Sequence, residues 1–213
     1  MSERSESNRP AVSESNRITC LHGFLGLPRD WDFLRDAGFE VATPPLDAIP
    51  DRGDVLLGYS MGGRLALRKL NGYKRAVIVS ARVRAPEPDR ADWSPRFAAE
   101  RWETLMRDWN AQPIFGGHVM PRNERDFDRR ELARQLRDYA PVAFDGPIDV
   151  PTLFVAGERD PKYVAEAEFA VGRWPLAEMW ICPSAAHRVP WEQPELFVDR
   201  LRSWTLRSGP RKS

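Results

Sequence analysis

The sequence predicts a single α/β domain with a mostly parallel sheet of about six strands. Two observations support this fold class. From residue 18 onward, short apolar segments alternate with helical patterns, as in a parallel sheet flanked by helices. One long segment, 82–149, interrupts the alternation with three tryptophans and helical patterns but no convincing strand. A chain of 213 residues is long enough for one core that carries such an insertion.

The expected strands are short, mostly apolar and bounded by glycine, proline or charged residues. They are 18–22, 39–43, 55–58, 76–80, 152–156 and 179–182. Helical patterns lie between or after them, at 30–36, 61–70, 164–171 and 194–204. Only residues 44–53 join the second expected strand to the third, fewer than a helical crossover normally takes. We therefore expect one crossover helix to be missing there.

The interruption divides the chain into a core of 18–81 and 150–206 and an inserted helical cap of 82–149. Helices are expected in the cap at 95–109 and 129–137. Long insertions often cover an active site, so the cap is interpreted as a lid; the alternative is a helical subdomain that only enlarges the core. The polar ends, 1–17 and 207–213, are expected to be flexible tails.

Composition excludes several classes of function. Lysine plus arginine (32) nearly balances aspartate plus glutamate (31), so no broad basic field favours nucleic acid or a membrane surface, and a small-molecule partner is expected. Cys20 and Cys182 end apolar segments and belong to no metal pattern, which indicates reduced core residues, with no metal and no cofactor. The first seventeen residues contain no apolar stretch that would form a secretory signal or membrane anchor, so a cytoplasmic protein is predicted. The oligomeric state stays open.

The segment 58–62, Gly-Tyr-Ser-Met-Gly, carries the strongest chemical signal. It follows an apolar strand pattern and begins a helical one. In that context the turn holds its serine in a strained conformation at the end of the strand, and glycines are needed on either side because side chains there would collide with neighbouring backbone. Ser60 is therefore the predicted nucleophile.

A serine hydroxyl needs a base, and the chain has three histidines: His22, His118 and His187. In folds with this turn the base follows the last strand, which selects His187. The carboxylate that orients the base should follow the preceding strand, where Glu158 and Asp160 both lie. We choose Asp160 because it precedes Pro161 in the loop, whereas Glu158 can equally be a solvated partner of Arg159. Glu158 is kept as the alternative because either carboxylate could orient the base.

Negative charge that develops on a reacting oxygen needs backbone N–H donors directed at it. Two donors are expected beside Ser60. The N–H of Met61 begins the helix after the nucleophile, and the N–H of Phe24 follows a His-Gly turn at the end of the first strand. Phe24 and Met61 therefore form the predicted oxyanion hole.

Four stretches carry a family resemblance: 21–26 (LHGFLG), 58–64 (GYSMGGR), 108–115 (DWNAQPIF) and 157–163 (GERDPKY). They resemble the α/β-hydrolase superfamily and, within it, the succinyl-hydroxycyclohexadiene-carboxylate synthases of the menaquinone pathway. The resemblance implies the α/β-hydrolase fold, without the two strands that usually come first. It also implies a lyase in which Ser60, activated by His187, abstracts a proton and drives elimination of pyruvate without an acyl-enzyme.

A carboxylate-rich substrate, as the resemblance implies, requires cations in the site. Arg64 and Trp109 match family positions, and Tyr59 is placed beside them next to the nucleophile. A further family arginine falls near Arg122 or Arg125, of which Arg125 is assigned to the site. One more, early in the cap, is either Arg84 or Arg90.

Two other functions use the same residues. A carboxylesterase or thioesterase would form an acyl-enzyme on Ser60, which His187 would then help water to hydrolyse. An apolar cap with Trp93, Trp102 and Phe115 favours this alternative. A non-catalytic binding protein on the same scaffold usually lacks a member of the Ser-His-Asp set, whereas all three are present here.

Overall fold

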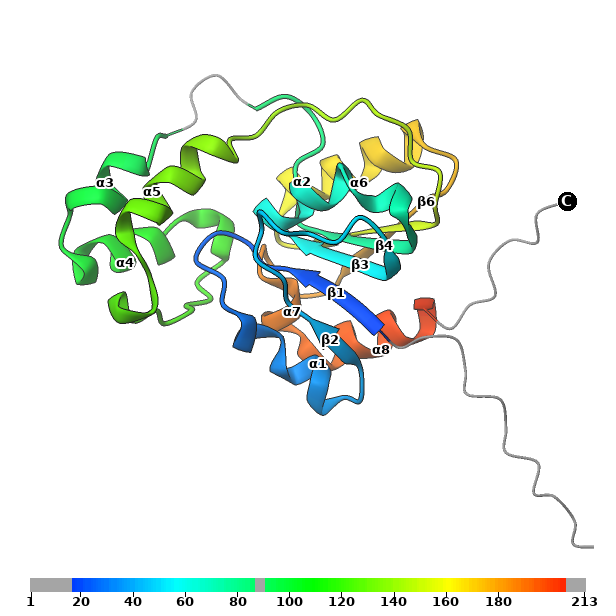
Figure 1. The fold of residues 1–213 in the computed structure, drawn as a ribbon, viewed down its shortest axis with the longest axis horizontal. Coiled ribbons are helices and arrows are strands. Elements are labelled where there is room, and N and C mark those ends of the chain that lie inside the picture. The colour runs from blue at the N-terminus through cyan, green and yellow to red at the C-terminus, as the bar shows by residue number, and fades with distance from the viewer. Residues whose placement is uncertain (1–16, 87–90, 206–213) are drawn as a thin grey trace, which may run out of the picture.

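The computed structural model describes residues 17–86 and 91–205, and the expected tails therefore lie outside the described residues, apart from Arg17. The described chain contains a six-stranded sheet in which every neighbouring pair is parallel, in the order β2-β1-β3-β4-β5-β6 (Figure 1). The strands are β1 (Arg17–Leu21), β2 (Glu40–Ala42), β3 (Gly53–Tyr59), β4 (Tyr73–Val79), β5 (Thr152–Gly157) and β6 (Ala177–Cys182). The predicted fold class and strand number are confirmed; only the strand ends shift.

Helices cover both faces of the sheet. They are α1 (Asp32–Asp36), α2 (Met61–Leu67), α6 (Pro161–Arg173), α7 (Val189–Glu192) and α8 (Pro194–Thr205), with short 3-10 turns η1 (Pro28–Trp31) and η2 (Leu70–Gly72). In β3, Leu57 packs with α1 and α8, whereas Leu56 packs with α2 and α6 on the opposite face. Successive side chains of a strand point to opposite faces, so a sheet buried on both sides needs the continuous apolar strands seen in the sequence.

The expected gap between β2 and β3 is present, because residues 43–52 contain no helix. Leu46 and Ile49 of this segment pack into the cluster on the α2 side of the sheet. A loop with two apolar anchors thus takes the place of a crossover helix.

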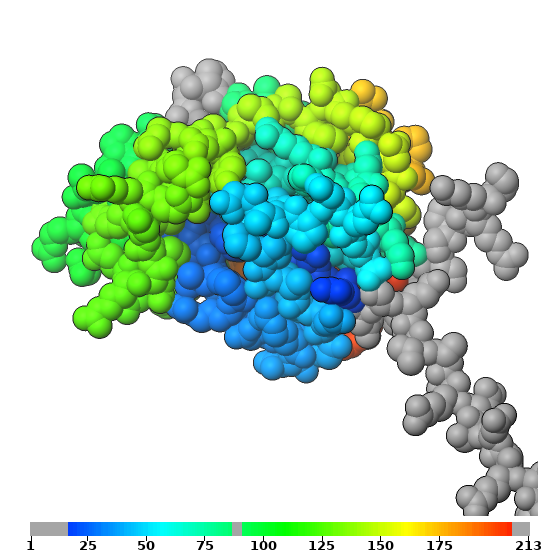
Figure 2. Space-filling view, viewed as in Figure 1, coloured from blue at the N-terminus to red at the C-terminus, as the bar shows by residue number. Residues whose placement is uncertain are grey.

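The cap forms a separate group of helices next to the carboxyl ends of the strands (Figure 1). Its elements are α3 (Ser94–Ala99), α4 (Trp102–Asn110), η3 (Pro113–Phe115), η4 (Glu124–Asp126) and α5 (Arg129–Asp138). They pack around their own apolar cluster, which includes Phe97, Leu105 and Leu132. Figure 2 shows the cap, in green, in contact with the blue N-terminal part of the core.

The prediction of one helix over 95–109 was wrong, because the chain is extended at Glu100 and two helices result. The cause is a distant arginine on α5. The guanidinium of Arg129 donates hydrogen bonds to the carbonyl oxygens of Phe97 (2.8 Å) and Glu100 (2.5 Å). These carbonyls end α3, and binding them to a cation stabilises the break. None of the described helices combines the length and apolar character needed to span a bilayer.

Candidate active site

Ser60 lies on a sharp turn between β3 and α2. Its φ of 51° and ψ of −109° are values that a residue with a side chain rarely adopts. A Cβ on Gly58 would lie 2.6 Å from the carbonyl oxygen of Gly62, and one on Gly62 would lie 2.5 Å from that of His22. Both glycines are therefore needed for close approach of backbone, as expected from the motif, and they present the Ser60 hydroxyl at the end of the strand.

Three side chains from distant parts of the chain meet at this turn. His187 Nε2 lies 3.1 Å from Ser60 Oγ, and His187 Nδ1 lies 2.9 Å from Asp160 Oδ2. His187 and Asp160 are each only 3% exposed. A proton on Nδ1 satisfies the carboxylate and leaves Nε2 as the acceptor for the serine hydroxyl. The arrangement is chemically able to move a proton from Ser60 to His187.

Glu158, the alternative acid, points elsewhere. Its carboxylate accepts a hydrogen bond from the backbone N–H of Ser184 (2.9 Å) at an exposed position. Arg159 pairs with Glu192 (3.2 Å) and not with Glu158. Of the two carboxylates in the loop after β5, only Asp160 contacts the imidazole.

Aromatic rings surround the imidazole of His187. The ring centres of Tyr163, Tyr59 and Phe115 lie 4.6, 5.5 and 6.0 Å from it. The cap also reaches the backbone here, because His187 N–H donates to the carbonyl of Ile114 (3.3 Å). Burial raises the pKa of Tyr59 and Tyr163, so both hydroxyls stay protonated. Tyr163 was missed as a site residue, although its place one helical turn after Asp160 was a usable signal.

A cavity of about 310 Å³ opens in front of Ser60, between the core loops and the cap. Phe24 and Met61, the residues predicted to form the oxyanion hole, both line it together with Ser60. Met61 is the first residue of α2, where a backbone N–H has no acceptor within the helix. The ring of Phe24 packs against Phe97 and Trp109 of the cap, with centres 4.7 and 5.2 Å apart.

The cavity wall is strongly cationic. Among the described residues that line it, five are cationic and one is acidic: Arg64, Arg82, Arg122, Lys162, Arg188 and Asp30. Asp30 is already paired, because Arg122 donates to both of its carboxylate oxygens at 3.0 and 2.7 Å. Both side chains of this pair are at least 90% buried, which joins the cap to the core. The excess of positive charge favours an anionic ligand.

The predicted substrate-binding residues are only partly brought together. Arg64, Tyr59 and Trp109 line the cavity, and Arg64 also donates to the carbonyl of Tyr139 (2.6 Å). The prediction that Arg125 binds substrate was wrong, because Arg125 does not line the cavity. It lies exposed in η4. Arg122 lines the cavity instead, three residues earlier and before the 3-10 turn reverses the chain.

Neither candidate for the early cap arginine is placed in the cavity. Arg84 pairs with the buried carboxylate of Glu166 (3.3 Å) and does not line the cavity. Arg90 lies outside the described residues. Arg82, the first residue of the segment 82–149, does line it and was not predicted. In the ranges 17–86 and 91–205, no group of three or more histidine, cysteine, aspartate or glutamate side chains is arranged to hold a metal ion.

His22, in the His-Gly turn, gives the folded protein a pH dependence. Its Nδ1 lies 2.8 Å from the carbonyl oxygen of Gly23, and burial lowers its pKa below the ordinary 6.5. The unfolded chain therefore binds this proton more readily, so the free energy of unfolding falls as pH decreases below about 6.5. We expect His22→Asn to reduce that loss. Urea unfolding of both proteins at pH 7.5 and 5.5 measures it; an equal loss in both would contradict the assignment.

Comparisons with known proteins agree with this fold. Residues 17–200 match the model of the Alpha/beta hydrolase family. A 2-succinyl-6-hydroxy-2,4-cyclohexadiene-1-carboxylate synthase of Escherichia coli O17:K52:H18 is 26% identical, over 86% of this chain and 91% of its own. This similarity confirms the resemblance to the synthases that the motifs indicated.

Two solved structures share the fold. MenH from S. aureus superposes with a TM-score of 0.72 at 21% identity, over 94% of this chain and 96% of that one. An esterase, EaEST, from Exiguobacterium antarcticum superposes with a TM-score of 0.69 at 15% identity, over 91% and 92%. The family model covers most of the sequence, from β1 into α8. The chain therefore belongs to the alpha/beta hydrolase family of enzymes.

Proposed function

We propose that this protein is a lyase that eliminates pyruvate from a carboxylate-rich small molecule, the reaction implied by its resemblance to the 2-succinyl-6-hydroxy-2,4-cyclohexadiene-1-carboxylate synthases. The observation that carries the proposal is the charge of the cavity next to Ser60 and His187. Of the described residues that line it, five are cationic, and the single acid is paired with one of them. A neutral ester gains nothing from such a wall, whereas a polycarboxylate binds to it.

In the proposed reaction, Ser60 and His187 act together as the base. His187 Nε2 takes the hydroxyl proton while Ser60 Oγ removes a proton from an acidic carbon of the substrate. The electron pair of that C–H bond moves into the substrate, and the bond to the leaving group breaks. Pyruvate departs as its enolate and regains a proton, which the imidazolium supplies.

The remaining groups stabilise charge. The N–H groups of Phe24 and Met61 are proposed to bind the enolate-like oxygen that forms on proton loss. Asp160 stabilises the imidazolium and holds Nδ1 protonated, at the distance of 2.9 Å already described. No covalent bond to Ser60 is needed, because the serine exchanges a proton and not an acyl group.

The second candidate is a carboxylesterase or thioesterase. It is favoured by the aromatic part of the wall, which includes Trp93, Trp109 and Phe115, and by structural likeness to esterases. In that reaction Ser60 would attack a carbonyl carbon, and the same N–H groups would bind the tetrahedral oxyanion.

The two candidates differ in product and in intermediate. Purified protein is assayed for pyruvate release from the menaquinone-pathway precursor and for hydrolysis of a short p-nitrophenyl ester. Quenched reactions are analysed by intact-protein mass spectrometry for an acyl group on Ser60. Pyruvate release without an acyl adduct supports the lyase. Ester turnover with an acyl adduct and no pyruvate would replace it with the esterase.

The acid is tested separately with two substitutions in one loop. Asp160→Asn is expected to lower kcat about 10³- to 10⁴-fold, because an amide favours the wrong imidazole tautomer. Glu158→Gln, only two residues away, removes a carboxylate that contacts Ser184 and not His187, and is expected to keep kcat within about threefold. Steady-state kinetics give kcat of both variants. Comparable losses of kcat in the two would contradict the choice of Asp160 as the acid.

A further inference from the structure

Arg188, the residue after His187, was not singled out by any motif. Its side chain is only 4% exposed, yet it lines the cavity in front of Ser60. Nη1 of its guanidinium donates to Asn110 Oδ1 (2.8 Å) and to the carbonyl of His118 (2.5 Å). The guanidinium carbon lies 3.7 Å from the ring centre of Phe115. These three partners come from the cap, and all are uncharged.

Two carboxylates in this region are engaged with other groups: Glu192, whose charge acts on Arg188, and Asp30, which lines the same cavity. Glu192 accepts the backbone N–H groups of Arg188 and Ala186, both at 2.8 Å, and its side chain also pairs with Arg159. Asp30 is held by both terminal nitrogens of Arg122. Among the described residues, the contacts of the Arg188 guanidinium therefore include no carboxylate.

A buried cation without an anionic partner is costly unless a ligand supplies the charge. Burial lowers the pKa of Arg188 and the nearby Arg122 acts in the same direction, while Tyr59, which accepts a side-chain hydrogen bond, and the more distant charge of Glu192 oppose them. An arginine still keeps its proton at physiological pH. Its two hydrogen bonds to the cap use one of three nitrogens, so even with Tyr59 as a neighbour, N–H donors remain for a ligand.

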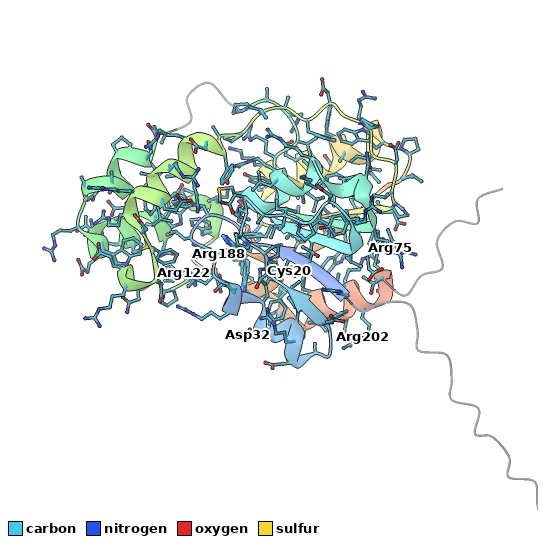
Figure 3. All side chains as sticks on the ribbon, in the orientation of Figure 1. Cys20, Asp32, Arg75, Arg122, Arg188 and Arg202 are labelled. Atoms are coloured by element: carbon cyan, nitrogen blue, oxygen red, sulfur yellow. The ribbon has the colours of Figure 1, made fainter. Side chains whose placement is uncertain are left out.

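We propose that Arg188 is a specificity-determining residue that binds a carboxylate of the substrate beside His187. The class of ligand, a carboxylate, rests on the proposed function. The assignment of Arg188 to bind it is a separate inference. Figure 3 shows Arg188 and Arg122 between the cap and the sheet, where a ligand of the cavity would lie. The stack on Phe115 holds the planar guanidinium flat, which suits the two parallel hydrogen bonds of a carboxylate.

A purely structural role is the competing explanation, because Arg188 also ties Asn110 and His118 of the cap to the core. The two roles differ in charge selectivity. A structural tie would affect charged and neutral ligands alike, whereas a carboxylate-binding arginine favours the charged one. The test therefore compares succinate with succinamide, which has a similar shape and no charge.

Affinities of both probes are measured by isothermal titration calorimetry on the full chain. Wild-type protein is expected to prefer succinate, and Arg188→Gln to reduce the succinate-to-succinamide preference at least tenfold, the loss expected for one charge-assisted hydrogen-bonding group. Arg125→Gln, an exposed cap arginine outside the cavity lining, is the matched control and should keep the preference. Thermal unfolding of each variant verifies that it is folded.

An unchanged preference in folded Arg188→Gln, or no preference in the wild type, would overturn the proposal. If Arg188→Gln does not fold, Arg188→Lys takes its place, since lysine keeps the charge but not the planar fork. It is expected to bind succinate more weakly with succinamide affinity unchanged; equal weakening of both probes counts against the proposal. No turnover is measured, so a failure of the pyruvate assay is a separate result.

Discussion

Ser60→Ala is expected to lower kcat by about a millionfold, the loss seen when the serine of a Ser-His-Asp set is removed. The hydroxyl lies 3.1 Å from Nε2 of the buried His187 imidazole, to which it can pass its proton. Without Oγ, both the proton abstraction and the ester attack lose their reacting atom. Single-turnover and steady-state assays with pyruvate or p-nitrophenol detection measure the loss.

Ser80→Ala is the matched control. Ser80 follows the neighbouring strand β4, has a similarly strained φ of 46° and is only 1% exposed. Its hydroxyl has no hydrogen-bond partner in the structure, so removing it takes away a buried polar group that contributes no bond. We expect kcat within about threefold of wild type. Activity that survives in Ser60→Ala would remove Ser60 from the mechanism.

The fold was largely predictable because its determinants are local. A strand that is buried on both faces has a short, continuously apolar sequence. Six such segments predicted the six strands. The turn at Ser60 was recognisable from its own residues: Gly58 approaches the backbone of Gly62 within the turn, although Gly62 is also required by the distant carbonyl of His22. The sequence therefore predicted the parallel sheet of about six strands and the turn that carries Ser60, but not the order of the strands.

Features that depend on distant contacts were predicted less well. The break at Glu100 follows from Arg129, 29 residues later, whose guanidinium binds the Glu100 carbonyl. The choice between Arg122 and Arg125 depends on Asp30 in η1, whose carboxylate pairs with Arg122. Local periodicity carries no information about such partners, and Arg188 was missed for the same reason.

Gly62→Ala is expected to destabilise the protein by about 1–3 kcal/mol or more, because the added methyl group would overlap backbone that has no room to move. Its Cβ would lie 2.5 Å from the carbonyl oxygen of His22 and in conflict with that of Leu21, at the end of strand β1. Relief requires α2 to move away from β1. Urea unfolding monitored by tryptophan fluorescence gives the change in free energy of unfolding.

Gly172→Ala makes the same chemical change with the opposite expected sign. Gly172 lies exposed near the end of α6, and an added Cβ there would meet no atom within 4 Å. Alanine is favoured over glycine in a helix by about 0.5–1 kcal/mol, so this variant should be slightly more stable than wild type.

Because Gly62 lies between Ser60 and the turn that carries Phe24, its substitution should also lower activity in the fraction that stays folded. Equal stability of the two variants would show that the close approach of α2 to β1 is not what holds Ser60 in place.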